Sequence, residues 1–351
     1  MDRFVSLQRK VAPEIAKLLD IRYSILRHVH FYQPIGRRTL SSQLTVKERT
    51  VRSELEFLRR QGFVSVSSAG VTLTQDGEAI FQELGQYVRE LREFARLEQA
   101  LEHLLPIRRI VVVAGDSRRD PAVKKDMGRA VVRLLREIVE EGDIIAAGGG
   151  TTMVEVAKAI VPSGWPKHIT VVPTRGSLGE EVEIQADSIA VEMARLLGGT
   201  YRVLNVPDDL HPETISRIMS EPRIKEILEL IKTARIVIHG VGTLDEMIKR
   251  RNIPLEETKL LKSLGAVAEM FGYYFDKEGN MVYYTPSMGI RPEDLQGKKT
   301  ISVAGGANKA QALLAVVKRH SREALVIDEA AGLKILEIEG GGKRNGSKDW
   351  N

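Results

Sequence analysis

Residues 143–152 read DIIAAGGGTT, a short apolar run that ends in three glycines and two threonines. The apolar run has the length of a buried strand, and the following MVEVAKAI at 153–160 has the apolar spacing of a helix. A glycine loop between strand and helix presents backbone N–H groups to an anion, and Thr151 and Thr152 add hydroxyls. The stretch predicts an α/β fold with an anion site at Gly149, Gly150 and the two threonines.

The same alternation of strand and helix patterns extends over residues 107–340. Strand-like runs are IVVVA from 110, DIIAA from 143, HITVVP from 168, YRVLNVP from 201, RIVIHG from 235, ISVAGG from 301 and ALVID from 324. This pattern predicts a doubly wound, mostly parallel sheet with helices on both faces. Ligands bind such sheets beyond the carboxyl ends of the strands, so the loops at those ends hold the candidate site.

Two further loops carry polar or cationic residues at predicted strand ends. PTRGSLGEEVEIQAD at 173–187 contains Arg175 and Gly176, where a guanidinium can grip a phosphate through two hydrogen bonds, and Gln185, a candidate partner for hydroxyls. VAGGANKA at 303–310 repeats the design with Gly306 and Lys309. One glycine loop alone is most often a tight turn, but three such loops favour an anionic ligand.

The loops match neither common nucleotide motif. GGGTT is not followed by Gly-Lys-Ser/Thr, and HGVGTL at 239–244 lacks the third glycine of a dinucleotide fingerprint. A small phosphorylated molecule is therefore favoured, and the separate sets at Thr151/Thr152 and at Arg175 predict two anionic ends. Glu269 is a candidate acceptor for sugar hydroxyls or, equally, a structural carboxylate, and Arg250 adds charge. The aromatic residues around DKEGN at 276–280 are expected to form a hairpin core.

Residues 1–75 have the element order of a winged helix-turn-helix. An apolar-spaced helix at 21–32 precedes a short helix in GRRTLSSQL at 36–44 and a third helix at 46–61, which we expect Thr45 and Glu48 to start as a capping box. FVSVSSAGVTLT at 63–74 alternates as a two-stranded hairpin.

The third helix is the predicted DNA reader. Residues 37–60 contain seven Arg or Lys and three Glu, and Val51, Leu55 and Leu58 share the apolar face. The helix start, with Val46 and Lys47, is placed in the major groove. Arg49, Thr50 and Ser53 are expected near base edges, and Arg37, Arg38 and Arg52 near phosphates. The alternative is a solvated basic face on a protein-binding helical domain.

Residues 76–106 predict a long helix, with apolar residues at Ile80, Leu84, Tyr87, Leu91, Phe94, Leu101 and Leu105. So narrow a stripe is typical of a helix that pairs with another, which predicts a dimerising linker. The alternative is a surface helix packed on its own domain. Glu98 is the one position that breaks the stripe, and Pro106 closes the segment.

The amino-acid composition narrows the class of protein. The 351 residues, 43% hydrophobic and 28% charged, fit about two domains, with no leader-like N-terminus and no membrane-length apolar run. Zero cysteines exclude thiolate metal sites and suit the cytoplasm, and the seven scattered histidines predict no metal site. The net charge is +5. The polar end at 341–351 is expected to be disordered.

IGRRTLSSQL, GGGTTM, PTRGSLGEEVEIQA, AEMFGYYF and VAGGANKAQA together resemble the SorC/DeoR family of sugar-responsive bacterial transcription regulators, over about residues 10–337. The resemblance implies a repressor of glycolytic genes with fructose-1,6-bisphosphate as effector and no cofactor. It also implies that Thr151, Thr152 and Lys309 contact phosphate and that Arg175, Gln185, Glu269 and Arg250 complete the site.

The leading hypothesis is a homo-oligomer, dimer or tetramer, that binds operator double-stranded DNA through residues 1–75 and the sugar effector through 107–340. The competing hypothesis is a phosphosugar isomerase or deaminase fused to a DNA reader. It needs a general acid or base, for which Glu180, Glu181, Asp187 and Glu269 are candidates. No adjacent histidine or lysine identifies a catalytic pair, so no catalytic residue is predicted.

Overall fold

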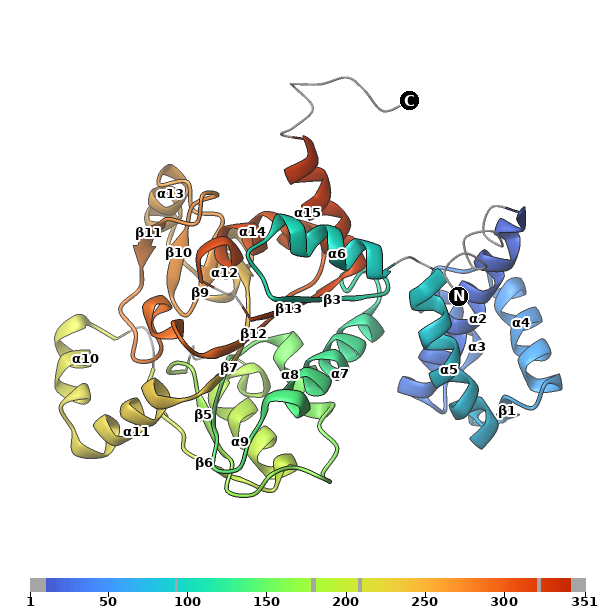
Figure 1. The fold of residues 1–351 in the computed structure, drawn as a ribbon, viewed down its shortest axis with the longest axis horizontal. Helices are drawn as coiled ribbons and strands as arrows, with labels where there is room; N and C mark the ends of the chain where they lie inside the picture. The colour runs from blue at the N-terminus through green and yellow to red at the C-terminus, as the bar shows by residue number, and fades with distance from the viewer. Residues whose placement is uncertain (1–10, 92–93, 178–180, 208–209, 321–322, 342–351) are drawn as a thin grey trace. The chain divides into compact units, whose positions relative to one another are not determined.

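The computed structural model describes residues 11–91, 94–177, 181–207, 210–320 and 323–341 (Figure 1). The chain divides into two compact units, Met1–Leu97 and Glu98–Asn351, and each is described by itself. Glu180 and the tail predicted to be disordered, apart from Gly341, lie outside the described residues. No helix among the described residues is long and apolar enough to cross a membrane.

The N-terminal unit has the predicted winged helix-turn-helix order. Its elements are α2 (Pro13–Tyr32), α3 (Arg37–Leu44), α4 (Glu48–Arg60), β1 (Val64–Ser67), β2 (Gly70–Leu73) and α5 (Gln75–Leu91). β1 and β2 pair antiparallel as the predicted wing. Val51, Leu55 and Leu58 of α4 are buried in one core with Leu26 and Leu40, so the opposite face of α4 points to solvent.

The predicted capping box at Thr45 is wrong. Thr45 is the C-cap of α3 with a left-handed backbone (φ 53°), and the N-cap of α4 is Lys47, with no side-chain cap. An N-cap side chain reaches the helix amides only from an extended backbone, so Thr45 cannot serve α4. At the other end Gly62, with φ 80°, follows the C-cap residue of α4.

The segment predicted as one linker helix contains α5 and α6 (Phe94–Leu104), separated by residues 92–93, which lie outside the described part. On α5, Phe81 is buried in the core of the N-terminal unit, and Ile80 and Leu84 pack against it. The packing of these side chains agrees with the alternative prediction, in which the helix packs on its own domain. Dimerisation through this segment stays a prediction.

The C-terminal unit contains the predicted parallel sheet. Its strands are β3 (Arg109–Val113), β4 (Ile144–Ala147), β5 (Thr170–Pro173), β6 (Thr200–Tyr201), β7 (Ile236–Gly240), β12 (Lys299–Val303) and β13 (Ala324–Asp328). They lie in the order β3-β13-β12-β7-β4-β5-β6, and every pair is parallel. The strand predicted in YRVLNVP is confined to Tyr201, which pairs with β5 together with Thr200.

Helices cover both faces of this sheet, as the almost uniformly apolar strands require. α7 (Pro121–Ile138), α8 (Thr151–Lys158) and α9 (Ala186–Leu197) bury their apolar sides against Ile145, Val171 and other strand residues. α11 (Pro222–Thr233), α14 (Ala310–His320) and α15 (Glu329–Gly341) lie on the other side (Figure 1). α10 (Pro212–Met219) precedes α11.

A second, antiparallel sheet was not predicted as such. It has the order β11-β10-β9-β8 and is formed by β8 (Gly242–Thr243), β9 (Ala268–Met270), β10 (Tyr273–Phe275) and β11 (Met281–Tyr284), with α12 (Leu244–Arg250) and α13 (Leu255–Ser263) inserted after β8. β10 and β11 are the predicted aromatic hairpin, in which Tyr274 is buried. Because β8 follows β7 directly, this sheet adjoins the carboxyl end of the central parallel strand.

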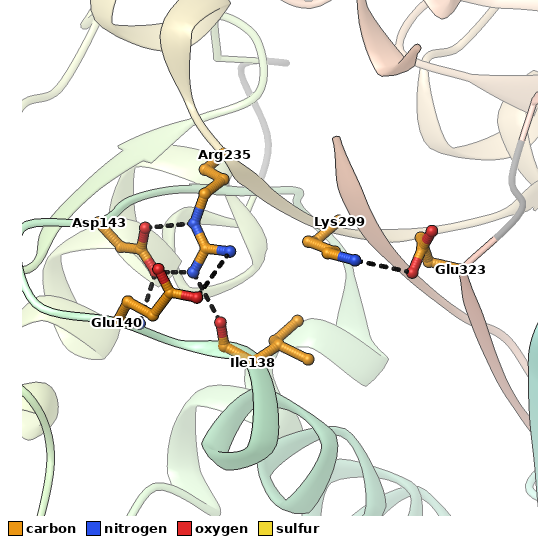
Figure 2. A network of polar contacts seen from close by, with 6 residues as sticks. All are labelled: Ile138, Glu140, Asp143, Arg235, Lys299 and Glu323. Atoms are coloured by element: carbon orange, nitrogen blue, oxygen red, sulfur yellow. Dashed lines mark hydrogen bonds and ion pairs between the residues drawn. The ribbon is translucent and has the colours of Figure 1, made fainter. Parts of the chain in front are cut away.

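The amino ends of the central strands are held by ion pairs. Arg235, just before β7, donates from Nε to Asp143 Oδ1 (2.6 Å) and from Nη2 to Ile138 O (2.6 Å), and Nη1 lies 3.4 Å from Glu140 Oε1 (Figure 2). Lys299 pairs with Glu323 at 3.3 Å, between β12 and β13. These cations are already matched by carboxylates, so this edge is a structural one.

Two carboxylates of α6 explain the break in the apolar stripe. Glu98 Oε1 accepts a hydrogen bond from Val112 N (2.7 Å), and Glu102 Oε1 accepts one from Ile110 N (2.8 Å). β3 is an edge strand, and its outward amides would otherwise lack partners in the ladder. Glu98, which interrupts the stripe, and Glu102 therefore close the edge of the sheet.

We predict that Glu98→Leu lowers the free energy of unfolding of the C-terminal unit by about 1–3 kcal/mol, because the buried Val112 amide loses its acceptor. Urea titration followed by Trp165 fluorescence, in a Trp350→Phe background, measures the change. Glu98→Gln is the matched control, since its amide oxygen still accepts the bond. Equal stability of Glu98→Leu and the parent would contradict this role.

Candidate functional site

A cavity of about 540 Å³ opens at the carboxyl edge of the parallel sheet. From β4 the chain runs outward through β5 and β6 and then returns to β7 on the other side of β4. The loops after β4 and β7 therefore diverge, and the gap at such a switch point is where α/β sheets bind ligands. The volume is within the range of small-molecule sites.

The three glycines after β4 are required by close packing and backbone conformation within the protein. A Cβ on Gly149 would lie 2.8 Å from Ile184 O, and one on Gly148 would lie 3.2 Å from the Cα of His239. Gly150 is the N-cap of α8 with φ 119°, a conformation that favours glycine. The loop is thus pressed between two neighbouring segments, and Thr151 and Thr152 begin α8 at the cavity.

Two lysines lie at this end of the cavity. Lys124 of α7 donates from Nζ to Thr151 Oγ1 (3.1 Å). Lys309 donates to Val241 O (2.9 Å) and forms an ion pair of 2.9 Å with Glu246. Burial and then repulsion by Lys309 lower the pKa of Lys124. The carboxylates of Glu246 and Glu155 oppose this shift.

The cavity lining also contains a buried ion pair between Arg175 and Glu269. Arg175 Nη1 donates to Glu269 Oε1 at 2.9 Å, and both side chains are less than a tenth exposed. Glu269 Oε1 also accepts from Gly272 N at 2.6 Å. Glu269 therefore serves as a structural carboxylate and also lines the cavity, and its role as an acceptor for sugar hydroxyls stays a prediction. Its charge already offsets that of Arg175.

Every predicted effector residue except Gly306 lines the cavity: Gly149, Gly150, Thr151, Thr152, Arg175, Gly176, Gln185, Arg250, Glu269 and Lys309. The described lining has more cations than carboxylates, with Arg118, Lys124, Arg175, Arg250 and Lys309 against Glu246 and Glu269. A concave site with excess positive charge raises the local concentration of anions.

Gly306 does not belong to the described lining, and its amide instead holds the loop after β12 in place. Its N–H donates to Asp328 Oδ2 (2.7 Å), which also accepts from Ser117 N (2.8 Å), and Asp328 is fully buried. The neighbouring Gly305 lines the cavity, and a Cβ there would lie 2.5 Å from Ser117 Oγ. Asp328 thus ties the loop after β12 to the loop after β3.

His239 is a cavity residue that the sequence pattern did not identify. It is the penultimate residue of β7, is fully buried, and pairs through Nε2 with Ser302 Oγ (3.0 Å) and through Nδ1 with Gly240 O (3.0 Å). Burial lowers its pKa to about 4. The ring is therefore neutral near pH 7. The sequence feature that could have identified His239 is its position near the end of the predicted strand RIVIHG.

Of the described acid and base candidates of the enzyme hypothesis, Asp187 and Glu181 do not belong to the cavity lining. Asp187 accepts from Leu204 N (2.9 Å) and Asn205 N (3.1 Å), and Glu181 is exposed. Neither is part of the cavity lining, in contrast to Glu269. Within the described residues there is no cluster of His, Asp or Glu suited to a metal ion.

The predicted DNA-contacting residues lie around α3 and α4 of the N-terminal unit. The exposed ones are Arg37, Arg38, Lys47, Arg49, Arg52 and Ser53, whereas Val46 and Thr50 are half-buried. Arg37 Nε donates to Glu48 Oε1 at 3.2 Å, which links the two helices. On the far side of α4, Arg22 of α2 pairs with Glu54 (2.7 Å) and stacks on Phe57 at 3.6 Å.

Comparison with known proteins covers both units. Residues 18–88 match the family described as "CggR N-terminal DNA binding domain", and residues 89–337 match the family described as "Putative sugar-binding domain". The chain is 38% identical to the Central glycolytic genes regulator of Bacillus subtilis, over 97% of this chain and 100% of that protein. It is also 38% identical to the Priestia megaterium protein of the same name, over 96% and 99%.

Solved structures agree with these matches. "The crystal structure of the putative SorC family transcriptional regulator from Enterococcus faecalis" is 39% identical and superposes with a TM-score of 0.65, covering 69% of this chain and 99% of that one. The full-length sorbitol operon regulator SorC from Klebsiella pneumoniae, at 18% identity, shows the same fold with a TM-score of 0.65 over 90% and 99%.

These relatives are transcriptional regulators and not enzymes, and the match extends through the DNA-binding and the sugar-binding unit alike. The chain therefore belongs to the family of central glycolytic genes regulators, within the SorC group of transcriptional regulators.

Proposed function

We propose that the chain is a cytoplasmic repressor of glycolytic genes that binds operator DNA as a homo-oligomer and responds to fructose-1,6-bisphosphate or a closely related phosphosugar. One observation carries the choice of ligand: the cavity combines the amide end of α8 with more cations than carboxylates. A neutral sugar would leave that charge unbalanced, whereas a phosphorylated sugar compensates it.

Position within the cavity supports a sugar with two phosphates. The lining combines Thr152, Lys309 and the glycine loop with Arg175, and we propose that these two sets hold the two phosphates. Arg175 is offset by Glu269, and Arg250 adds a further guanidinium beside the glycine loop, 3.7 Å from the position of a Cβ on Gly150. Glu269 and Gln185 supply acceptors for the hydroxyls between the phosphates.

The DNA-binding unit and the effector cavity are joined through α6. This helix continues from the N-terminal unit, and its Glu98 and Glu102 hold β3, whose carboxyl end leads to the cavity residues Ser117 and Arg118. The effector shifts DNA binding only if it binds the two states of the protein differently. We propose that the bound sugar favours the state with lower operator affinity.

The coupling is tested by an electrophoretic mobility shift titration of the full chain on an operator isolated by in vitro selection. We expect saturating fructose-1,6-bisphosphate to change the operator affinity by about 5- to 150-fold, which corresponds to a coupling free energy of ~1–3 kcal/mol. An affinity that ignores the sugar, under conditions where a thermal shift shows that it binds, would refute the regulatory mechanism.

For the DNA reader, we expect Arg49→Ala to weaken operator binding by ~1–3 kcal/mol and to lower the preference for operator over random DNA, since a guanidinium reads guanine edges. Arg38→Ala is the comparison, because loss of a phosphate contact weakens binding to all sequences and reduces its salt dependence. Fluorescence anisotropy at several salt concentrations measures both. Unchanged sequence preference in Arg49→Ala would remove Arg49 from the reading surface.

For the effector site, Thr152→Ala is expected to weaken phosphosugar binding by roughly 10- to 100-fold, the worth of one hydrogen bond to a charged group. The rise in melting temperature with fructose-1,6-bisphosphate should shrink accordingly. Thr233→Ala is the control, since that hydroxyl donates to Glu229 O and Leu230 O within its own helix, α11. Arg175→Ala should also reduce the shift and, by leaving Glu269 unpaired, lower the melting temperature without ligand. An unaltered ligand-induced rise in Thr152→Ala would place the sugar elsewhere.

A further inference from the structure

Lys124 is a cavity residue with no counterpart in the sequence motifs. It lies in the first turns of α7, well before the glycine loop, and is half-buried. Its Nζ donates to Thr151 Oγ1 at 3.1 Å, so the ammonium group lies at the residue where α8 begins. The fold, not a local motif, brings this charge to the helix N-terminus.

The surroundings of Lys124 are short of negative charge. Lys309 also lines this end of the cavity and repels it, and Glu246, which pairs with Lys309 at 2.9 Å, attracts both. The backbone amides that start α8 add partial positive charge. Glu155 attracts Lys124 as well, but of these two carboxylates Glu246 alone belongs to the described lining of the cavity, where two ammonium groups and a helix N-terminus meet.

We propose that Lys124 is a specificity-determining residue of the effector cavity, which together with Lys309 and the start of α8 selects a phosphate dianion over a neutral or singly charged group. This inference rests on the proposed function. The bond to Thr151 places the ammonium so that an incoming phosphate oxygen can accept a hydrogen bond from Lys124 Nζ. A hydroxyl or a carboxylate compensates less of the charge and is bound less well.

The sequence provides a matched control. Lys125 is the next residue of the same helix, and burial likewise lowers the pKa of its side chain, but it lies outside the described lining of the cavity. Lys124→Met and Lys125→Met remove the same charge from the same helix. Lys124→Arg keeps the charge and tests whether a cation at this position is what matters.

Isothermal titration calorimetry of the full chain with fructose-1,6-bisphosphate, fructose and inorganic phosphate tests the inference. We expect Lys124→Met to weaken binding of the bisphosphate at least tenfold, the loss of about one charged hydrogen bond. We expect Lys124→Arg to restore much of the affinity and Lys125→Met to resemble the parent. Lys124→Met should also bind with a smaller dependence on salt, which a purely structural role would not change.

The outcomes separate this inference from the proposed function. If the parent binds the bisphosphate and Lys124→Met binds it equally well, with the same salt dependence, the role of Lys124 is refuted while the proposed function stands. If the parent binds inorganic phosphate in a Lys124-dependent manner but no sugar phosphate, the phosphate site is supported and the proposed effector is refuted. If the parent binds none of these ligands, both are refuted.

Discussion

The parallel pairing of β4 with β7 is the constraint on which the rest of the C-terminal unit depends. The Gly148 amide donates to Ile238 O (2.8 Å), and the chain passes so close to His239 that a side chain on Gly148 would meet its Cα. Beyond this contact the glycine loop leads into α8 and the β7 loop leads into β8, and both loops line the cavity. The cavity is the space between them, and α8 starts at its wall.

Charge is distributed unequally between the two edges of the parallel sheet. At the amino edge Arg235 is matched by Asp143 and Glu140, so the cations there hold strands together. At the carboxyl edge the cations that line the cavity are only partly matched. The same residue types thus have a structural role at one edge and are available to a ligand at the other, and only the second arrangement attracts an anion.

The predictable parts of the fold were those with a local signal. The strand runs, the winged helix-turn-helix order and the loops at strand ends follow from periodicity and glycine placement, whereas Thr45 was assigned to the wrong helix because its left-handed backbone leaves no mark in the residue pattern. The sequence pattern identifies Glu98 as the interruption of the apolar stripe. Its partner, the amide of Val112, belongs to a strand whose place at the sheet edge is not encoded locally.

For the site, the sequence by itself determined which loops line the cavity, because a strand, a glycine turn and a helix start are consecutive residues. The tertiary structure decided which distant side chains join them. Lys124 reaches Thr151 from another helix, Glu269 comes from a second sheet to pair with Arg175, and His239 is neutral because it is buried. The tertiary structure also gives another reason for the glycines, because a Cβ on Gly149 would lie 2.8 Å from Ile184 O. Such contacts depend on the order of strands in the sheet, and strand order is a property of the whole fold.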